Sequence, residues 1–306
     1  MFYRELNSGF LMIDKVDLVM WTKNGGKTLP SVLKRINLVI PLENVRNRLI
    51  VDDNSTDDTV KIAEANGWQA IPNAGTGISS GANTALKSVE CDYFVSFEQD
   101  LLLARDWWEK IPPYLENHHV GAASGMRFAS QPRGVTRLQQ YVALKYRGEA
   151  QLSSWLRTRQ NAAFTLGSTL DNTIYKTAVI RSIGGFPVVK TNAGVDTTLA
   201  YKLKMAGYSW IVDYNVQSIH LRTGLRHELR HQYWYGTQTP EIWRTVEEDS
   251  HNRAPISRFG IFYRFAISPF TGVFVAYKMR EATIAFIHPL IRFYYLKGYL
   301  ESGKCN

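Results

Sequence analysis

Short apolar runs alternate with amphipathic segments in the first part of this sequence. Runs at residues 16–22, 47–53, 68–73 and 92–100 have the length and composition of β-strands. Between them, apolar residues recur at helical spacing in three segments, 28–40, 55–67 and 79–90. This alternation predicts an α/β fold with a doubly wound, mostly parallel sheet over roughly residues 15–125.

Four acidic residues follow two of the predicted strands. Asp52 and Asp53 end one strand, and Glu98 and Asp100 end another. Ligands of open α/β sheets bind at the carboxyl ends of the strands. We therefore expect these four side chains to share one rim of the sheet.

Helical patterns predominate beyond this alternation. The segment 127–159 is basic and aromatic with a helical pattern, and we expect it to pack beside the sheet or to cover the cleft. Residues 195–209 predict a helix that ends at Gly207, and residues 210–221 predict a further strand.

The C-terminal part of the chain is apolar and aromatic. Residues 259–277 carry one charge, but glycines and a proline interrupt them, so they fall short of a clean membrane-spanning helix. Residues 284–300 are aromatic with scattered Arg and Lys. This pattern is typical of helices that lie in a membrane interface, and a helical tail packed on the main domain is the alternative. We predict a main domain over residues 1–235 and a C-terminal amphipathic helical segment over residues 236–306.

Composition indicates a folded chain and locates its positive charge. Hydrophobic residues make up 45% of the 306 residues, which is ordinary for a protein with a buried core. The formal net charge is +9, and residues 220–306 hold 12 Lys and Arg against 7 Asp and Glu. A basic C-terminal segment favours anionic lipid. We expect no nucleic-acid partner, because the basic residues lie among long apolar stretches without a recognised nucleic-acid-binding motif.

Two features bear on the cellular compartment. Cys91 and Cys305 lie far apart without His or Cys neighbours, so neither a disulfide framework nor a zinc site is expected. Residues 1–15 contain no apolar run of signal-peptide length behind a basic start. We therefore expect the main domain to stay in the cytoplasm.

The run SFEQD places two carboxylates at a strand end. Glu98 and Asp100 are two residues apart, and side chains at this spacing point to the same side of a strand. Such oxygen ligands suit Mg²⁺ or Mn²⁺ held against a substrate diphosphate. A solvated strand end is the alternative explanation.

The run LIVDDNSTDDT leads from a buried strand into a turn, where Ser55 or Thr56 is expected to cap the next helix. Asp52 is placed to accept hydrogen bonds from a nucleobase or ribose, as acids after a strand do in other nucleotide-binding folds. For Asp53, a purely structural role in the turn is the alternative.

Asp196 stands beside Gly194 at the start of a predicted helix. It is either an acid stabilised by the helix dipole or a general base that takes a proton from an acceptor hydroxyl. His220 follows a strand and is either structural or part of a metal site. The residues placed to neutralise a leaving diphosphate, unless they form a solvated helix face, are Arg222, Arg226, Arg230 and His231.

Taken in order, these motifs resemble glycosyltransferase family two, whose members share an A-type nucleotide-sugar-binding α/β fold. LVMWTKNGGKTLPSVL resembles the opening strand and loop, LIVDDNSTDDTVKIA the nucleotide-binding turn, and SFEQD the metal-binding Asp-x-Asp. IRSIGGF, GVDTTLAYKLKMAGYS and VQSIHL resemble the later Gly-Gly-Phe, Glu-Asp and histidine motifs. The resemblance covers roughly residues 16–235.

The resemblance implies roles for the matching residues. Asp100 and His220 would bind Mn²⁺ or Mg²⁺, and Asp196 would be the catalytic base. Family members of this type invert the anomeric configuration in a single displacement. The residues expected at the nucleotide-sugar donor, the first three of them at the nucleoside, are Thr22, Asn24, Asp52, Asp53, Glu98, Arg222 and Arg230.

Two positions depart from the family pattern. Glu98 replaces the first Asp of Asp-x-Asp, which keeps the charge but lengthens the reach, and Val195 replaces the Glu of Glu-Asp. The presumed base Asp196 remains, so we expect an active enzyme with an unusual acceptor pocket. A non-catalytic nucleotide-sugar-binding protein is the alternative.

The activity implied by the resemblance is inverting, metal-dependent transfer of a hexose, such as mannose or glucose, from a UDP- or GDP-sugar. The C-terminal segment resembles the membrane-associating tail of family members that glycosylate lipid-linked acceptors. We therefore expect a lipid-linked or glycan hydroxyl or phosphate as the acceptor. The catalytic domain, residues 1–235, would work at the cytoplasmic face of a membrane, with residues 236–306 on the membrane surface.

Overall fold

The computed structural model describes residues 13–129, 134–142, 168–189, 193–221, 224–250 and 258–302. Within these ranges, eight strands form one sheet in the order β3-β2-β1-β4-β7-β6-β8-β5. The strands are β1 (Val16–Thr22), β2 (Val45–Asp52), β3 (Gln69–Pro72), β4 (Tyr93–Glu98), β5 (Leu101–Leu102), β6 (Val120–Ala129), β7 (Thr173–Lys176) and β8 (Ser209–His220).

Six of the described strands point in one direction. β1, β2, β3 and β4 pair in parallel, and β6 and β8 resume this direction beyond the reversed strand β7. The two-residue strand β5 runs against β8. The predicted doubly wound, mostly parallel α/β sheet is therefore confirmed, with two short reversed strands in its second half. The carboxyl ends of the six aligned strands meet at one rim.

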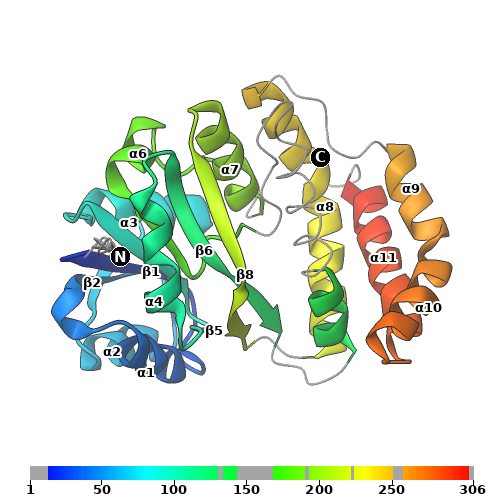
Figure 1. Ribbon diagram of the computed structural model, residues 1–306, viewed down its shortest axis with the longest axis horizontal. Coiled ribbons are helices and arrows are strands. Elements are labelled where there is room, and N and C mark those ends of the chain that lie inside the picture. The colour runs from blue at the N-terminus through cyan, green and yellow to red at the C-terminus, as the bar shows by residue number, and fades with distance from the viewer. Residues whose placement is uncertain are drawn as a thin grey trace, which may run out of the picture.

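Helices cover both faces of the sheet (Figure 1). One face carries α1 (Leu29–Val39), α2 (Thr59–Ala65) and α4 (Trp107–Lys110), and the other carries α3 (Gly77–Ser88), α6 (Thr177–Ser182) and α7 (Val195–Met205). Each face of the sheet has its own hydrophobic core. In β1, Leu18 and Met20 pack in the core under α1, α2 and α4, and Val19 and Trp21 pack in the core under α3, α6 and α7. All seven residues of β1 are buried, which explains why a nearly continuous apolar run encodes this strand.

The helix after β2 begins later than the sequence predicts. α2 starts at Thr59, so the expectation that Ser55 or Thr56 caps it is wrong. The Ser55 hydroxyl instead accepts a hydrogen bond from the backbone N–H of Asn24 (2.8 Å). Asp57 Oδ1 accepts the N–H of Thr59 (3.0 Å). The Ser55 hydroxyl therefore binds the loop after β1 and does not cap α2.

The segment predicted as helical from residue 127 begins as a strand. β6 continues past Arg127 because it pairs with β8, and the last pair in this register is Ala129 with His220. Residues 135–142 are helical, as expected. The prediction for residues 143–159 lies outside the described residues.

The C-terminal helices form a layer beside the sheet (Figure 1). They are α8 (Leu225–Ser250), α9 (Arg258–Ala266), α10 (Ser268–Met279) and α11 (Ile284–Glu301). α8 continues without a break through the domain boundary expected at residue 235, and it packs along α11. No single described helix is long and apolar enough to cross a membrane, whereas α9 from Phe259 and α10 reach that length together with a bend of 55°.

Candidate metal and donor site

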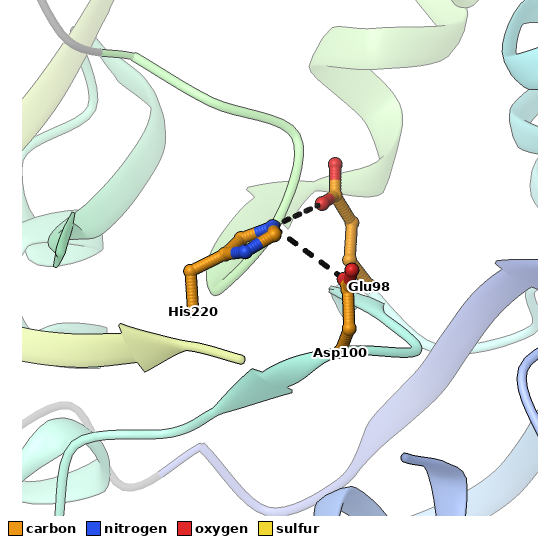
Figure 2. A group of neighbouring side chains, drawn as sticks. All are labelled: Glu98, Asp100 and His220. Atoms are coloured by element: carbon orange, nitrogen blue, oxygen red, sulfur yellow. Dashed lines mark ion pairs between the residues drawn. The ribbon is translucent and has the colours of Figure 1, made fainter. Parts of the chain in front are cut away.

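Two carboxylates and one imidazole meet at the rim where β4 and β8 end. The possible ligand atoms of Glu98, Asp100 and His220 all lie within 4.8 Å of one another. His220 Nε2 is 3.4 Å from Glu98 Oε2 and 3.5 Å from Asp100 Oδ1, and Figure 2 shows the imidazole facing both acids. Because Leu101 of β5 pairs with His220, the preceding Asp100 is held beside the imidazole.

This group of side chains fits a divalent metal ion. Carboxylate oxygens are ligands of Mg²⁺ and Mn²⁺, and an imidazole nitrogen adds affinity for a transition metal. The side chains of Glu98, Asp100 and His220 are only 20%, 11% and 10% exposed. Acids this close and this buried repel each other, and a cation between them relieves that repulsion. The mixed oxygen and nitrogen set therefore suits Mn²⁺, with Mg²⁺ as a second fit.

A partly buried arginine that the sequence did not single out, Arg127, lies next to Glu98. Arg127 Nη1 is 3.7 Å from Glu98 Oε2 and 3.1 Å from Asp171 Oδ2, and Asp171 is fully buried. Burial disfavours the charge on Arg127, yet Asp171 and Glu98 hold its pKa well above the ordinary value. Burial also favours neutral Asp171, but Arg127 keeps the pKa of Asp171 below its ordinary value. The pair therefore stays ionised beside the metal ligands.

A cavity of about 410 Å³ adjoins the candidate metal ligands Glu98 and Asp100. Its walls include Thr22, Lys23, Asp53, Glu98, Gln99 and Asp100. Asp53 Oδ2 accepts a hydrogen bond from the N–H of Gly77 at the start of α3 (3.2 Å) and lies 3.6 Å from Lys23 Nζ. The structure thus brings Thr22 and Asp53 of the expected donor residues to one cavity with the carboxylates.

Asp52 and Asn24 shape the loop beside this cavity, and neither is among its described lining residues. Asp52 Oδ2 accepts the N–H of Ser55 (2.9 Å), and Asn24 Oδ1 accepts the N–H of Thr56 (2.8 Å). Asn24 has φ +52°, a left-handed conformation that Asn adopts more readily than most residues. Asp52 Oδ1 is buried without a hydrogen-bond partner in the described part of the chain, so this oxygen can still accept a hydrogen bond from a ligand.

Gln99 connects the strand end that carries Glu98 and Asp100 to the loop after β1, a role that the sequence did not suggest. Its Oε1 accepts hydrogen bonds from the Thr22 hydroxyl and from the N–H of Lys23 (2.9 Å). Its Nε2 donates to the carbonyl of Lys23 (3.0 Å). The residue between the two acids therefore fixes the wall of the donor cavity.

Asp196 faces a smaller cavity of about 80 Å³ at the N-terminus of α7, and Glu98 and Arg127 line the same cavity. The preceding Gly194 has φ +85°, and a Cβ there would lie 2.7 Å from Ile242 Cγ1 of α8, so this close turn requires glycine. Burial raises the pKa of Asp196, and the charge of Arg127 partly opposes this effect. Asp196 is thus a carboxylate of raised basicity beside Glu98, a candidate metal ligand.

Of the two arginines expected at the donor, only Arg230 lies in the described part of the chain, and it does not reach the cavity beside the carboxylates. Arg222 lies outside the described residues, and Arg230 is exposed on α8 without lining any of the three described cavities. α8 instead lines the Asp196 cavity with His231, Trp234 and Tyr235. Their spacing of three and four residues places them on one helix face, a periodicity present in RHQYWY.

A sheet rim with this triad, an adjoining cavity and a carboxylate at a helix start is the arrangement that the sequence led us to expect of an A-type glycosyltransferase. The family model described as "Glycosyl transferase family 2" matches residues 17–182, which is more than half of the 306 residues. The chain belongs to glycosyl transferase family 2 and is a glycosyltransferase. No curated protein sequence matches it.

Solved structures confirm the predicted A-type fold. The mannosyltransferase PcManGT from Pyrobaculum calidifontis, in complex with GDP-Man and Mn²⁺, is 18% identical with a TM-score of 0.59, covering 94% of this chain and 86% of that chain. Glucosyl-3-phosphoglycerate synthase from Mycobacterium tuberculosis, with Mn²⁺, UDP and glucosyl-3-phosphoglycerate, is 15% identical with a TM-score of 0.54, covering 78% and 80%. S. aureus TarS 1-349 with UDP-GlcNAc is 13% identical with a TM-score of 0.51, covering 95% and 92%.

Proposed function

We propose that this glycosyltransferase moves a hexose from a UDP- or GDP-sugar to an acceptor with inversion at the sugar carbon, in a Mn²⁺- or Mg²⁺-dependent reaction. One observation carries the proposal. Glu98 of the triad lines both the cavity of about 410 Å³ and the cavity of Asp196, so the triad adjoins both spaces. A donor and an acceptor can therefore approach the same point from two sides.

The reaction follows from this arrangement. The acceptor oxygen attacks the anomeric carbon, the bond from that carbon to the nucleoside diphosphate breaks, and Asp196 takes the proton of the acceptor hydroxyl. Its pKa, raised by burial, makes Asp196 a stronger base than an exposed Asp. A bound divalent ion would stabilise the negative charge on the leaving diphosphate. Asp53 and the loop held by Gln99 would position the donor.

The acceptor class and the location of the enzyme are part of the same proposal. We infer contact with an anionic membrane surface and a lipid-linked acceptor from aromatic stripes on the C-terminal helices. These exposed stripes consist of Phe259, Phe262 and Tyr263 on α9, Phe270, Phe274 and Tyr277 on α10, and Phe286 and Phe293 on α11. Exposed Lys278 and Arg280 at the end of α10 add positive charge, which anionic lipid attracts. A cytoplasmic face is consistent with such a surface.

Donor turnover tests the proposal directly. Purified protein is incubated in detergent with a panel of UDP- and GDP-sugars, with Mn²⁺ or with EDTA, and nucleoside diphosphate release is measured with and without lipid-linked acceptors. We expect metal-dependent release from one donor and stimulation by a lipid-linked acceptor. Binding of a donor without release under any condition would favour a non-catalytic nucleotide-sugar-binding protein, the alternative that Glu98 and Val195 suggest.

A further inference from the structure

The first acid of the candidate metal site is a glutamate. Glu98 ends β4, and its side chain is 20% exposed. A glutamate side chain has one more rotatable bond than an aspartate, so fixing its carboxylate in one orientation costs more conformational entropy. A metal ligand with this freedom gains affinity when a neighbouring group restricts its orientation.

Arg127 of β6 is placed to restrict Glu98. Its Nη1 is 3.7 Å from Glu98 Oε2, the same oxygen that lies 3.4 Å from His220 Nε2. The guanidinium and the imidazole therefore approach one oxygen of the glutamate. β6 pairs with β8 as far as Ala129 and His220, so neighbouring strands carry the arginine and the histidine.

Asp171 balances the charge of Arg127. Its Oδ2 is 3.1 Å from Arg127 Nη1, closer than the Glu98 carboxylate, and Asp171 is fully buried. Arg127 stays charged, because Asp171 and Glu98 hold its pKa well above the ordinary value. An ion pair without net charge can orient Glu98 and does not add a positive charge that would repel a divalent cation.

Contacts outside the ion pair position both of its members. Asn172 follows Asp171, and its Oδ1 accepts a hydrogen bond from the N–H of Gly125 (2.8 Å). The carbonyl of Asn172 also accepts a hydrogen bond from Trp107 Nε1 (2.9 Å). Gly125 lies at a register irregularity of β6, two residues before Arg127, and a Cβ there would lie 2.7 Å from a backbone oxygen of β8. Irregularities of this kind redirect nearby side chains, so the fold itself sets the position of the pair.

We propose that Arg127, held by Asp171, is a positioning residue that orients the carboxylate of Glu98 toward the divalent ion. The inference rests on the proposed function, because it concerns the ion expected at Glu98, Asp100 and His220. It also explains how a glutamate serves where the family pattern has an aspartate. The longer side chain reaches the arginine, whereas an aspartate ends one methylene short of this contact. Arg127 acts through Glu98 and needs no contact with a substrate.

Mn²⁺ binding by the full chain tests this role without turnover. Free Mn²⁺ is measured by electron paramagnetic resonance during titration of the unmodified protein and of a double variant, Arg127→Gln with Asp171→Asn. The double variant removes one charge of each sign, and losing both members of an ion pair is tolerated better than losing one. We expect its Mn²⁺ affinity to be at least about ten-fold lower. Unchanged or tighter binding, or no binding by the unmodified protein, would overturn the inference.

Glu98→Asp separates an orienting role from general damage to the fold. The shorter carboxylate has already lost Arg127, so adding the double variant to Glu98→Asp should weaken Mn²⁺ by less than about two-fold further. Equal losses with glutamate and with aspartate would overturn the inference. Complete loss of Mn²⁺ in Glu98→Asp alone would also overturn it, because reach rather than orientation would then make Glu98 a ligand.

An exposed ion pair provides the matched control. Arg46 Nη2 is 2.7 Å from Glu90 Oε2, and both side chains are more than half exposed. Arg46→Gln with Glu90→Gln also removes one charge of each sign and should leave Mn²⁺ affinity unchanged. A loss equal to that of the Arg127 and Asp171 variant would contradict a specific role for Arg127.

Turnover keeps this inference distinct from the proposed function. Metal-dependent release of nucleoside diphosphate by the unmodified protein, without coupling between position 98 and the ion pair, would overturn the inference and leave the proposed function intact. Absence of release from every donor would count against the proposed function. The coupling in Mn²⁺ affinity would still establish the role of Arg127 in that case.

Discussion

Asp196 shares a cavity with Glu98 and Arg127 but is not one of the candidate metal ligands. Replacing its carboxylate with an amide therefore removes the proton acceptor and leaves the triad intact. We expect Asp196→Asn to lower kcat for transfer about 10²–10⁴-fold, with donor affinity retained in a calorimetric titration. Unchanged turnover would remove Asp196 from the mechanism.

The raised pKa of Asp196 sets the pH dependence of the reaction. A base acts only when deprotonated, so activity is lost as pH falls through its pKa. Burial raises that pKa above the ordinary value of 3.8. We expect the acid limb of kcat, measured at saturating donor and Mn²⁺, to lie above pH 3.8. A limb below pH 3.8 would contradict a buried base.

Asp171 is fully buried and pairs with Arg127, so its loss should destabilise the fold. Asp171→Asn removes the nearer of the two carboxylates that pair with Arg127 in the described part of the chain, and we expect a loss of about 3 kcal/mol in the free energy of unfolding in urea. The folded pKa of Asp171 is lowered, so its contribution is present above about pH 4 and is lost as pH falls further. Glu90→Gln, in an exposed pair with Arg46, is the control and should change little.

Residue roles could be predicted from sequence where neighbours in the chain create the site. Glu98 and Asp100 are two residues apart at a strand end, whereas His220 was placed beside them only by the family resemblance, and the structure brings all three together. Arg127 and Asp171 are 44 residues apart, and the fold of the sheet brings them together, so no local sequence pattern predicts their ion pair. Val195 is 2% exposed and packs in the core with Leu199, which explains why no acid stands at that position.

At the scale of elements, two glycines set the distance between α8 and α11. A Cβ on Gly236 would overlap the carbonyl of Tyr295, and one on Gly298 would overlap the carbonyl of Tyr233. Inside an unobstructed helix, Gly→Ala stabilises by up to about 1 kcal/mol. We expect Gly298→Ala to do the opposite and to destabilise by about 1–3 kcal/mol in thermal unfolding, because the helices must separate.

A matched substitution gives this helix-packing prediction its control. Leu300 is 52% exposed on the same helix, so Leu300→Ala should be close to neutral. A stabilised Gly298→Ala variant would mean that α8 and α11 are not in close backbone contact.

Helices and strands with a clear hydrophobic period in the sequence were predictable. The length of an element that depends on packing against another element was not. β1 and α7 follow their sequence patterns closely. α8 runs for 26 residues with Pro240 inside it, and its length depends on packing against α11 rather than on its own pattern. For this reason the expected boundary at residue 235 falls inside a helix.

At the scale of the whole molecule, the aromatic stripes determine where the enzyme would work. Phe270 and Phe274 are 79% and 52% exposed on α10. Burying a Phe side chain contributes about 1.5–3 kcal/mol, so replacing both with Ser should weaken binding to anionic vesicles at least about ten-fold in a sedimentation assay.

Exposed leucines on the sheet side provide the control for this vesicle assay. Leu38 on α1 and Leu42 after it are 73% and 53% exposed, and the double Ser variant there should bind vesicles like the unmodified protein. Equal loss in both double variants, or no loss in either, would contradict membrane docking through α10.

The position of Gln99 has a thermodynamic consequence for the whole enzyme. Because this side chain holds Lys23 and lies between Glu98 and Asp100, a nucleotide that orders the loop after β1 also orders both acids. Linked equilibria are reciprocal. The metal and the nucleotide must therefore change each other's affinity by the same factor. If each raises the affinity for the other, forms that hold the ion or the nucleotide alone are disfavoured, and the two should be released together.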